Sequence, residues 1–359
     1  MKAWENNIRK VIPYVPGEQP QQSSVIKLNT NENPYPPSPS VEKALLGLDL
    51  DLLRRYPDPS ASELVCSIAE FYGVTKEQVF AGVGSDDALA MTFLTCFHSN
   101  QPILFPDITY SFYEVWADLF RIPYQKQALD GEFYIRPEDY AKKNGGVIIP
   151  NPNAPTGICQ PLGQIEEIVK NNSDVIVVID EAYIDFGGDS ALPLLKKYEN
   201  LLIVQTFSKS RSFAGMRIGF LLGNPDLIRY IQDCKYSFNS YTLNQTAITL
   251  GAAVMRDKEY FDQCRNRIME TREWVKTKFL ELGFSFPDSM ANFLFVTHPQ
   301  FAAETLFMAL KEAGIYVRHF KKPERISNYL RITIGTREEM ECLVSFLNTY
   351  MSENRSESC

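Results

Sequence analysis

The run Val175-Ile176-Val177-Val178-Ile179 constrains the fold more than any other stretch of the chain. Apolar and polar residues do not alternate along it, which indicates a strand buried on both faces. Such strands are typical of parallel sheets that carry helices on both sides. Asp180 follows directly, so this strand is expected to deliver a carboxylate to the carboxyl edge of the sheet.

A second apolar run, residues 201–205, leads into a polar loop that contains Ser208 and Lys209. Arg217 follows Lys209 by eight positions. A lysine at the end of a buried strand is unusual, because an ammonium group there is costly unless it is paired or has a chemical role. A surface lysine in a turn is the simpler interpretation. It leaves unexplained why the same chain also has an acidic strand end at Asp180 and a Gly-Ser turn at Gly84.

Strands that alternate with helices through the middle of the chain predict an α/β fold with a mostly parallel sheet. After residue 282 the pattern changes and predicts a small α+β domain. The expected division is an arm over 1–40, a large domain over 41–275 and a small domain over 276–359. Seven prolines rule out long regular elements in the arm. Further strands are expected at 79–84, 103–105, 146–150, 217–222, 293–296, 316–318 and 329–334, and helices at 60–73, 85–97, 110–120, 165–171, 225–236, 246–253, 258–282, 302–313 and 337–350, with Ser85 or Asp86 as the N-cap of the second helix.

Composition narrows the classes of function. With 359 residues the chain exceeds the size at which single cores stop growing. A net charge of −8 without a long basic run argues against nucleic acid or an anionic membrane as the partner. No apolar run is long enough to span a bilayer, and the first residues lack the apolar region of a signal peptide, so we expect a cytoplasmic protein. The seven cysteines and three histidines show no metal-binding spacing, so no metal site is expected.

Reactive groups in open α/β sheets collect where strands end at the carboxyl edge. Asp180, Lys209, the loop around Asn153 and the turn at Gly84 all fall at such ends. An acid, an amine and an anion-binding turn together suit pyridoxal 5'-phosphate (PLP). The lysine would form the Schiff base, the acid would keep the ring nitrogen protonated, and a helix N-terminus would hold the phosphate.

Five motifs occur in an order that resembles the fold-type I PLP-dependent aminotransferases, and most closely the histidinol-phosphate aminotransferase family. They are Gly84-Ser85-Asp86, Asn153-Ala154-Pro155-Thr156-Gly157, Asp180-Glu181-Ala182-Tyr183, Ser208-Lys209 and Arg217. Leu28-Asn29-Thr30-Asn31-Glu32-Asn33-Pro34, Arg55-Tyr56-Pro57 and Leu330-Arg331-Ile332-Thr333-Ile334-Gly335-Thr336 add to the likeness, which runs from about Tyr14 to about Tyr350. The resemblance implies a large domain with a mostly parallel seven-stranded sheet, a small α+β domain and a homodimer.

The resemblance also implies roles for individual residues. Lys209 is the Schiff-base lysine and general base, Asp180 pairs with the pyridine nitrogen, and Tyr183 bonds the ring hydroxyl. The remaining cofactor contacts are Gly84, Ser85, Asp86, Ser208 and Arg217 at the phosphate, Tyr110 on the ring face, and Tyr56 reaching the cofactor phosphate of a partner subunit. Substrate contacts are Arg331 at the anionic end, with Arg318 and Tyr14 on the phosphate side. Structural roles stay open for Ser85 as a helix cap, for Tyr183 as a buried tyrosine and for Tyr56 as a surface residue.

One position departs from the family pattern. The family often has asparagine directly before Pro-Thr-Gly, where it contacts the cofactor hydroxyl, and this chain has Ala154. Asn153 is expected to supply that amide, although Tyr183 could make the contact alone. A missing hydrogen bond there would change the pKa of the cofactor rather than abolish its binding.

The expected reaction is transamination of L-histidinol phosphate with 2-oxoglutarate, giving imidazole acetol phosphate and glutamate in histidine biosynthesis. Aromatic amino acids are further candidate substrates, because Tyr14, Tyr110 and Tyr241 could line a pocket for a ring. The alternative enzyme is a PLP-dependent decarboxylase of a phosphorylated amino acid such as threonine phosphate. A PLP-binding regulatory protein without catalysis is a third possibility, but no helix-turn-helix segment is visible.

Overall fold

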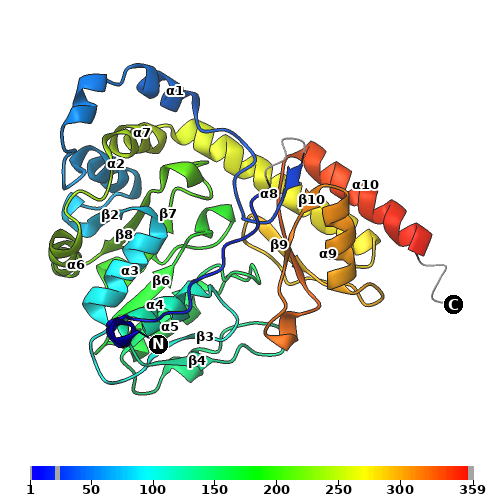
Figure 1. The fold of residues 1–359 in the computed structure, drawn as a ribbon, viewed down its shortest axis with the longest axis horizontal. Coiled ribbons are helices and arrows are strands. Elements are labelled where there is room, and N and C mark those ends of the chain that lie inside the picture. Colours follow the sequence, from blue (N-terminus) through cyan, green and yellow to red (C-terminus); the bar gives the residue numbers. More distant parts are fainter. Residues whose placement is uncertain (1, 21–24, 355–359) are drawn as a thin grey trace.

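The computed structural model describes residues 2–20 and 25–354. Its centre is a seven-stranded sheet with the strand order β2-β8-β7-β6-β5-β3-β4 (Figure 1). Five neighbouring strands, from β7 to β4, run parallel, whereas β8 is antiparallel to both β2 and β7. The bounds are β2 Val79–Gly82, β3 Ile103–Pro106, β4 Tyr124–Gln127, β5 Gly146–Pro150, β6 Val177–Asp180, β7 Leu201–Thr206 and β8 Gly219–Gly223. The predicted mostly parallel sheet is therefore confirmed.

Helices cover both faces of this sheet, as the unbroken apolar strands require. Val178 and Leu202 pack in one hydrophobic cluster with the helices α3, α4 and α6. Ile179 and Ile203, which point the other way, pack in a second cluster with α2, α5 and α7. The bounds are α2 Ser62–Tyr72, α3 Gly84–Cys96, α4 Phe112–Phe120, α5 Leu162–Asn171, α6 Pro225–Phe238 and α7 Gln245–Arg256.

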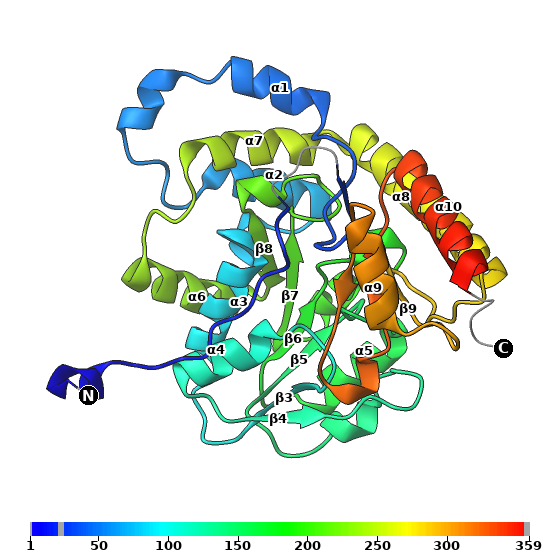
Figure 2. The same ribbon diagram turned by 45° about the vertical axis from the view of Figure 1, so that its right-hand side comes forward.

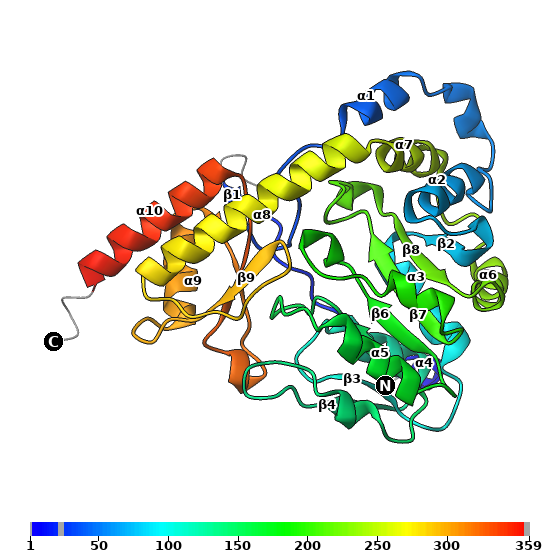
Figure 3. The same cartoon turned by 180° about the vertical axis from the view of Figure 1, so that it is seen from behind.

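A smaller α+β part follows the long helix α8, Lys258–Glu281, and lies beside the large sheet (Figure 3). Its sheet has the order β11-β12-β9, with antiparallel pairing throughout. These elements bury a third hydrophobic cluster together with one face of α8. The bounds are β9 Phe293–Val296, α9 Ala303–Glu312, β10 Ile315–Tyr316, β11 Arg318–His319, β12 Leu330–Thr333 and α10 Arg337–Asn354. The predicted domain boundary at residue 275 lies inside α8 and stays a prediction.

The N-terminal segment is mostly extended, and Figure 2 shows its beginning reaching away from the rest of the chain. It then joins the small part, because β1, Ile26–Lys27, pairs in parallel with β10. Beyond it, α1 spans Pro39–Leu46. Short 3-10 helices complete the element list: η1 Ala3–Asn7, η2 Leu50–Arg54, η3 Lys76–Gln78, η4 Pro137–Tyr140, η5 Ile184–Phe186, η6 Leu192–Lys196, η7 Ala214–Met216 and η8 Glu324–Ile326.

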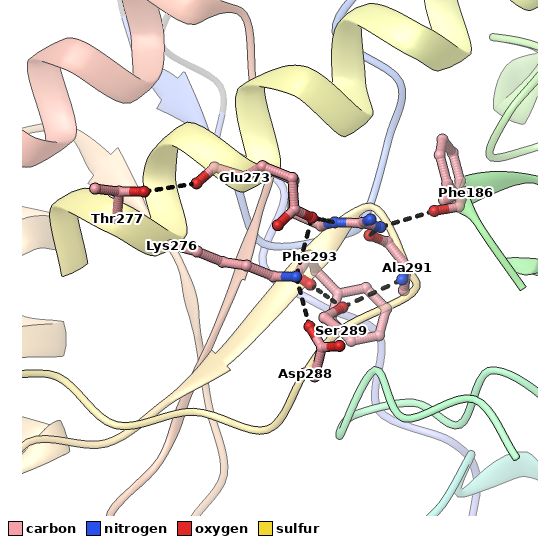
Figure 4. Close-up of polar contacts among 9 residues, drawn as sticks. Phe186, Glu273, Lys276, Thr277, Asp288, Ser289, Ala291 and Phe293 are labelled. Carbon is pink, nitrogen blue, oxygen red and sulfur yellow. Dashed lines mark hydrogen bonds and ion pairs between the residues drawn. The ribbon is translucent and has the colours of Figure 1, made fainter. Parts of the chain in front are cut away.

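A buried arginine on α8 joins the two parts. One guanidinium nitrogen of Arg272 donates hydrogen bonds to the carbonyl oxygens of Phe186, 2.8 Å away, and Ala291, 3.0 Å away. Figure 4 shows these carbonyl groups between α8, the large sheet and the loop before β9. Next to them Lys276 forms an ion pair with Asp288. The loop that follows Asp180 is thus tied to the small part.

Three details differ from the sequence expectations. The helix α3 begins at Gly84, so neither Ser85 nor Asp86 is its N-cap; the carboxylate of Asp87 instead accepts a hydrogen bond from the Val83 amide. Arg217 precedes β8 rather than starting it. The edge strand β4 was not expected, because its sequence is mostly polar and half of it is exposed.

In the part of the chain that the structure describes, no helix is long and apolar enough to cross a membrane.

Candidate active site

Asp180 and Lys209 come from neighbouring parallel strands. Asp180 is the last residue of β6 and pairs in register with Val204 of β7, and Lys209 follows the end of β7. Since parallel strands end at the same edge of a sheet, both side chains reach one cavity. The cavity also lies at the start of α3, whose backbone amides point toward it as at any helix N-terminus.

Asp180 is a buried carboxyl group, only 6% exposed. One carboxylate oxygen accepts a hydrogen bond from the hydroxyl of Tyr113 at 2.7 Å, and the other accepts one from the Ala182 amide at 3.2 Å. Burial raises the pKa of Asp180 to about 6, although both hydrogen bonds act in the opposite direction. No ion pair involves Asp180 within residues 2–20 and 25–354. A cation that entered the cavity would find an unpaired carboxylate.

Three consecutive residues, Asn29, Thr30 and Asn31, each contact a different side chain of the predicted site. We call them the strap. The carbonyl oxygen of Asn29 accepts from Arg331 at 3.0 Å, and that of Thr30 accepts from the Lys209 ammonium at 3.1 Å. The side-chain amide of Asn31 donates to the Tyr183 hydroxyl at 2.9 Å. The strap thereby connects the small part to the lysine.

Arg217 defines the end of the cavity at α3. Its guanidinium lies 3.3 Å from the Ser208 hydroxyl and 3.1 Å from a carboxylate oxygen of Asp86. A Cβ atom at Gly84 would lie 2.5 Å from the Arg217 guanidinium, and Gly84 has φ +84°, so a glycine is required there. Together with the amides of Ser85 and Asp86 this arrangement suits a phosphate group.

Tyr110 closes one wall of the cavity. Its hydroxyl donates to the other carboxylate oxygen of Asp86 at 2.7 Å, and burial together with Asp86 raises its pKa. Tyr14, from the N-terminal segment, packs edge-on against Tyr110 with 6.3 Å between ring centroids and stacks on Phe112. The segment therefore forms the outer wall of a second, larger cavity that adjoins the first.

Arg318 and Arg331 line this second cavity side by side. They are register partners on the antiparallel strands β11 and β12, where neighbouring side chains on one face lie close together. No carboxylate lies within ion-pair distance of either guanidinium among the described residues, and the Nε atom of Arg331 is buried there without a hydrogen-bond partner. Burial lowers the pKa of Arg331. Like charges placed in this way favour an anionic ligand.

Two of the predicted residues lie away from this group. The amide of Asn153 donates to the Ile108 carbonyl at 3.0 Å and accepts from the Thr109 hydroxyl at 3.0 Å, so it is used within the protein. Its neighbour Ala154 lines the cavity instead. Tyr56 is 81% exposed and stacks on Tyr241 at the surface. The other predicted residues gather around the two cavities: Tyr14, Gly84, Ser85, Asp86, Tyr110, Asp180, Tyr183, Ser208, Lys209, Arg217, Arg318 and Arg331.

Tyr113 and the contact made by Asn31 were not predicted from the sequence. Tyr113 follows Tyr110 by three positions, one helical turn, which was the available signal for a second tyrosine on the same side. Asn31 lies in a motif that the resemblance includes without giving this residue a role. Where the chain is described, no group of three His, Cys, Asp or Glu side chains is placed to hold a metal ion.

Comparison with known proteins gives consistent matches. The sequence model of the family "Aminotransferase class I and II" matches residues 23–347. A histidinol-phosphate aminotransferase of Lactococcus lactis is 49% identical over 356 residues, 99% of each chain. The crystal structure of the histidinol-phosphate aminotransferase from Clostridium acetobutylicum has a TM-score of 0.85 at 22% identity, covering 92% of this chain and 100% of that one. The Sinorhizobium meliloti enzyme of the same name, in complex with pyridoxal-5'-phosphate, has a TM-score of 0.81 at 20% identity, covering 90% and 91%.

Proposed function

This chain belongs to the class I and II aminotransferases, and from that premise we propose that it transfers the amino group of L-histidinol phosphate to 2-oxoglutarate. The products are imidazole acetol phosphate and glutamate, and the reaction is a step of histidine biosynthesis. The proposal rests on Arg318 and Arg331, which lie side by side next to the cavity of Lys209. Among the described residues, neither guanidinium group forms an ion pair with a carboxylate. A phosphomonoester is a dianion that needs such a pair of cationic donors.

The residues of the inner cavity fit PLP. The buried Asp180, which has no cationic partner among the described residues, suits a protonated pyridine nitrogen. Ser208, Arg217 and the first amides of α3 suit the phosphate, and Tyr110 suits the ring face. When bound, PLP withdraws electrons from the substrate carbon that loses its proton.

Lys209 carries the cofactor and then moves the proton. Its ammonium group lies 3.1 Å from the Thr30 carbonyl oxygen and 5.7 Å from the centre of the Tyr183 ring, at the boundary of the two cavities. From there the Lys209 amine, once released from the cofactor, would take the proton from the substrate carbon that bears the amino group and would deliver it to the cofactor carbon to which the lysine had been attached. Tyr183 would form a hydrogen bond with the ring hydroxyl of the cofactor.

The outer cavity orients the substrate. Arg331, held at the Asn29 carbonyl, binds the anionic end, and Arg318 with Tyr14 adds contacts to the phosphate. The same guanidinium groups bind a carboxylate of 2-oxoglutarate in the second half of the reaction. Aromatic amino acids are secondary substrates, because Tyr14 and Tyr110 offer ring faces.

We also propose that the active enzyme is a cytoplasmic homodimer. Tyr56 is 81% exposed, and several large apolar side chains close to it in the sequence are exposed as well, together with its stacking partner Tyr241. A second copy would cover them and receive Tyr56 at its cofactor phosphate. The exposed residues are Leu45, Leu46, Leu50, Leu53 and Tyr241.

The test is a titration of the purified enzyme followed by its visible absorption. The band of the lysine-bound cofactor should disappear when L-histidinol phosphate is added and return when 2-oxoglutarate follows. Threonine phosphate and phenylalanine are the matched controls, which separate phosphate recognition from ring recognition. A band that does not change with histidinol phosphate, together with release of carbon dioxide from threonine phosphate, would support the decarboxylase alternative instead. The names of relatives 49% identical to this chain do not favour that alternative.

A further inference from the structure

In this chain, one contact that the family pattern implies for the cofactor hydroxyl would be missing. Ala154 stands where the resembled family often has an asparagine, and a methyl group cannot form a hydrogen bond. Both ends of the Asn153 side chain already bond residues 108 and 109, and Ala154 rather than Asn153 lines the cavity. Another amide of the chain would therefore have to compensate for the missing hydrogen bond to the cofactor hydroxyl.

Asn31 brings a buried amide to the outer cavity, which Ala154 and Tyr183 also line. Its side chain is 1% exposed, and its Nδ2 donates to the Tyr183 hydroxyl at 2.9 Å. The Thr333 hydroxyl fixes which end of the amide faces Tyr183. That hydroxyl accepts from the Asn31 backbone N–H at 3.0 Å, so its own proton goes to Asn31 Oδ1 at 3.1 Å and leaves Nδ2 for Tyr183.

The backbone at Asn31 is held for this contact. Its φ of +57° lies in the left-handed region, where asparagine is one of the few residues other than glycine that occur regularly. Its carbonyl oxygen accepts from the Asn292 side chain at 3.0 Å, which ties it to the small part of the molecule. The position is therefore fixed by three hydrogen bonds besides the one to Tyr183.

We propose that Asn31 is a positioning residue that compensates for Ala154 by orienting the Tyr183 hydroxyl toward the cofactor. The inference rests on the proposed function, because it concerns the bound PLP. With its oxygen accepting from Asn31, Tyr183 has its only proton free to donate to the ring hydroxyl of the cofactor. That donation stabilises the ionised hydroxyl and lowers the pH at which the lysine-linked cofactor loses its proton.

The readout is the pH midpoint of the visible absorption in the enzyme without substrate. Removing the Asn31 amide should raise this midpoint by roughly 0.5 to 1 pH unit, the equivalent of one ordinary hydrogen bond. Lys209, Arg331, Tyr110 and Tyr113 are the titratable groups that face Tyr183. None of them changes in the variant.

The experiment compares four variants of the PLP-loaded enzyme with the wild type. Asn31→Gly keeps the left-handed backbone and removes the amide. Asn29→Ala is the matched control, a buried strap asparagine whose amide binds the Glu18 carbonyl instead of Tyr183. Tyr183→Phe and the double variant Asn31→Gly/Tyr183→Phe show whether Asn31 acts through Tyr183, and melting temperatures monitor folding.

The expected result is a raised midpoint for Asn31→Gly, no change for Asn29→Ala, and the same midpoint for the double variant as for Tyr183→Phe. An intact visible band with an unchanged midpoint in Asn31→Gly overturns the inference and leaves the proposed function standing. A shift that persists fully without the Tyr183 hydroxyl also overturns it. If the wild type shows no visible band after PLP is added, the proposed function fails as well.

Thr333→Val provides a second route that leaves Asn31 in place. It removes the hydroxyl that orients the Asn31 amide, so the midpoint should move in the same direction by a smaller amount. If Asn31→Gly does not fold, this variant decides alone: an unchanged midpoint rejects the proposal.

Discussion

Replacing Tyr113 by phenylalanine should change how the enzyme binds PLP in a manner that depends on pH. The Tyr113 hydroxyl donates to the Asp180 carboxylate at 2.7 Å, and the tyrosine is fully buried. Its removal leaves that carboxylate oxygen without the only side-chain donor the structure gives it. The ionised form of Asp180 is the form that loses stabilisation.

The size of the effect follows from the pKa of Asp180, which burial raises to about 6. A hydrogen bond to a charged group contributes roughly 1.5–3 kcal/mol, which corresponds to about one to two pH units. In Tyr113→Phe the pKa should therefore rise to about 7 or 8. At pH 7 Asp180 would then be half or more protonated, and PLP should bind about two- to tenfold more weakly than to the wild type.

The assay measures the dissociation constant of PLP for the cofactor-free wild type and the variant between pH 5 and pH 9. The ratio of the two constants should be close to one at pH 9, where Asp180 is ionised in both proteins, and should rise as the pH falls toward a plateau of about 10- to 100-fold near pH 5. Tyr140→Phe is the matched control, because Tyr140 is equally buried and its hydroxyl has no hydrogen-bond partner among the described residues. A ratio that is the same at every pH would show that only packing has changed and would refute the reasoning.

Three further variants test the site and the core. Lys209→Ala should lose the visible band of the lysine-bound cofactor, and its turnover should fall at least about a thousandfold, because the change removes both the covalent attachment and the base. A variant that still transaminates normally would contradict the role of Lys209. Arg331→Ala should raise the KM for histidinol phosphate by about 10- to 100-fold with the visible band retained, whereas loss of PLP would reassign this arginine. Burial raises the pKa of Glu181 to about 7, so the wild type should lose about 1 kcal/mol of unfolding free energy between pH 6 and pH 8 as this carboxyl group ionises. Glu181→Gln cannot ionise, and a denaturant titration should find this loss absent; an equal loss in both proteins would mean that another group titrates.

The parts of the fold that could be predicted from the sequence are those with a strong apolar pattern. The strands β5, β6 and β7 are fully buried, and each appears in the sequence as an unbroken apolar run. The edge strand β4 has the sequence Tyr-Gln-Lys-Gln and was missed, because an edge strand with exposed residues needs no apolar run. The pairing of β1 with β10 could not be predicted, since nothing local relates residues 26 and 315.

The candidate site shows the same division. Lys209 and Asp180 could be placed from the sequence because strand ends fall at one edge of a parallel sheet. The contacts of Tyr113 with Asp180 and of Asn31 with Tyr183 connect residues 67 and 152 positions apart. Short motifs carry no information on such distances. The cap expected at Ser85 was wrong for a local reason, because Gly84 starts the helix and Asp87 supplies the capping carboxylate.

The pairing of β1 with β10 also limits how this enzyme can be recombined with its relatives. The Leu28 amide donates to the Tyr316 carbonyl, and the Thr333 amide donates to the Leu28 carbonyl, so residues near the start of the chain complete the C-terminal sheet. A chimera with a single crossover in α8 would combine this start with a foreign sheet and would mismatch the strap that holds Lys209. Exchanging residues 25–33 together with the C-terminal part keeps that unit intact, although its two pieces lie at opposite ends of the gene.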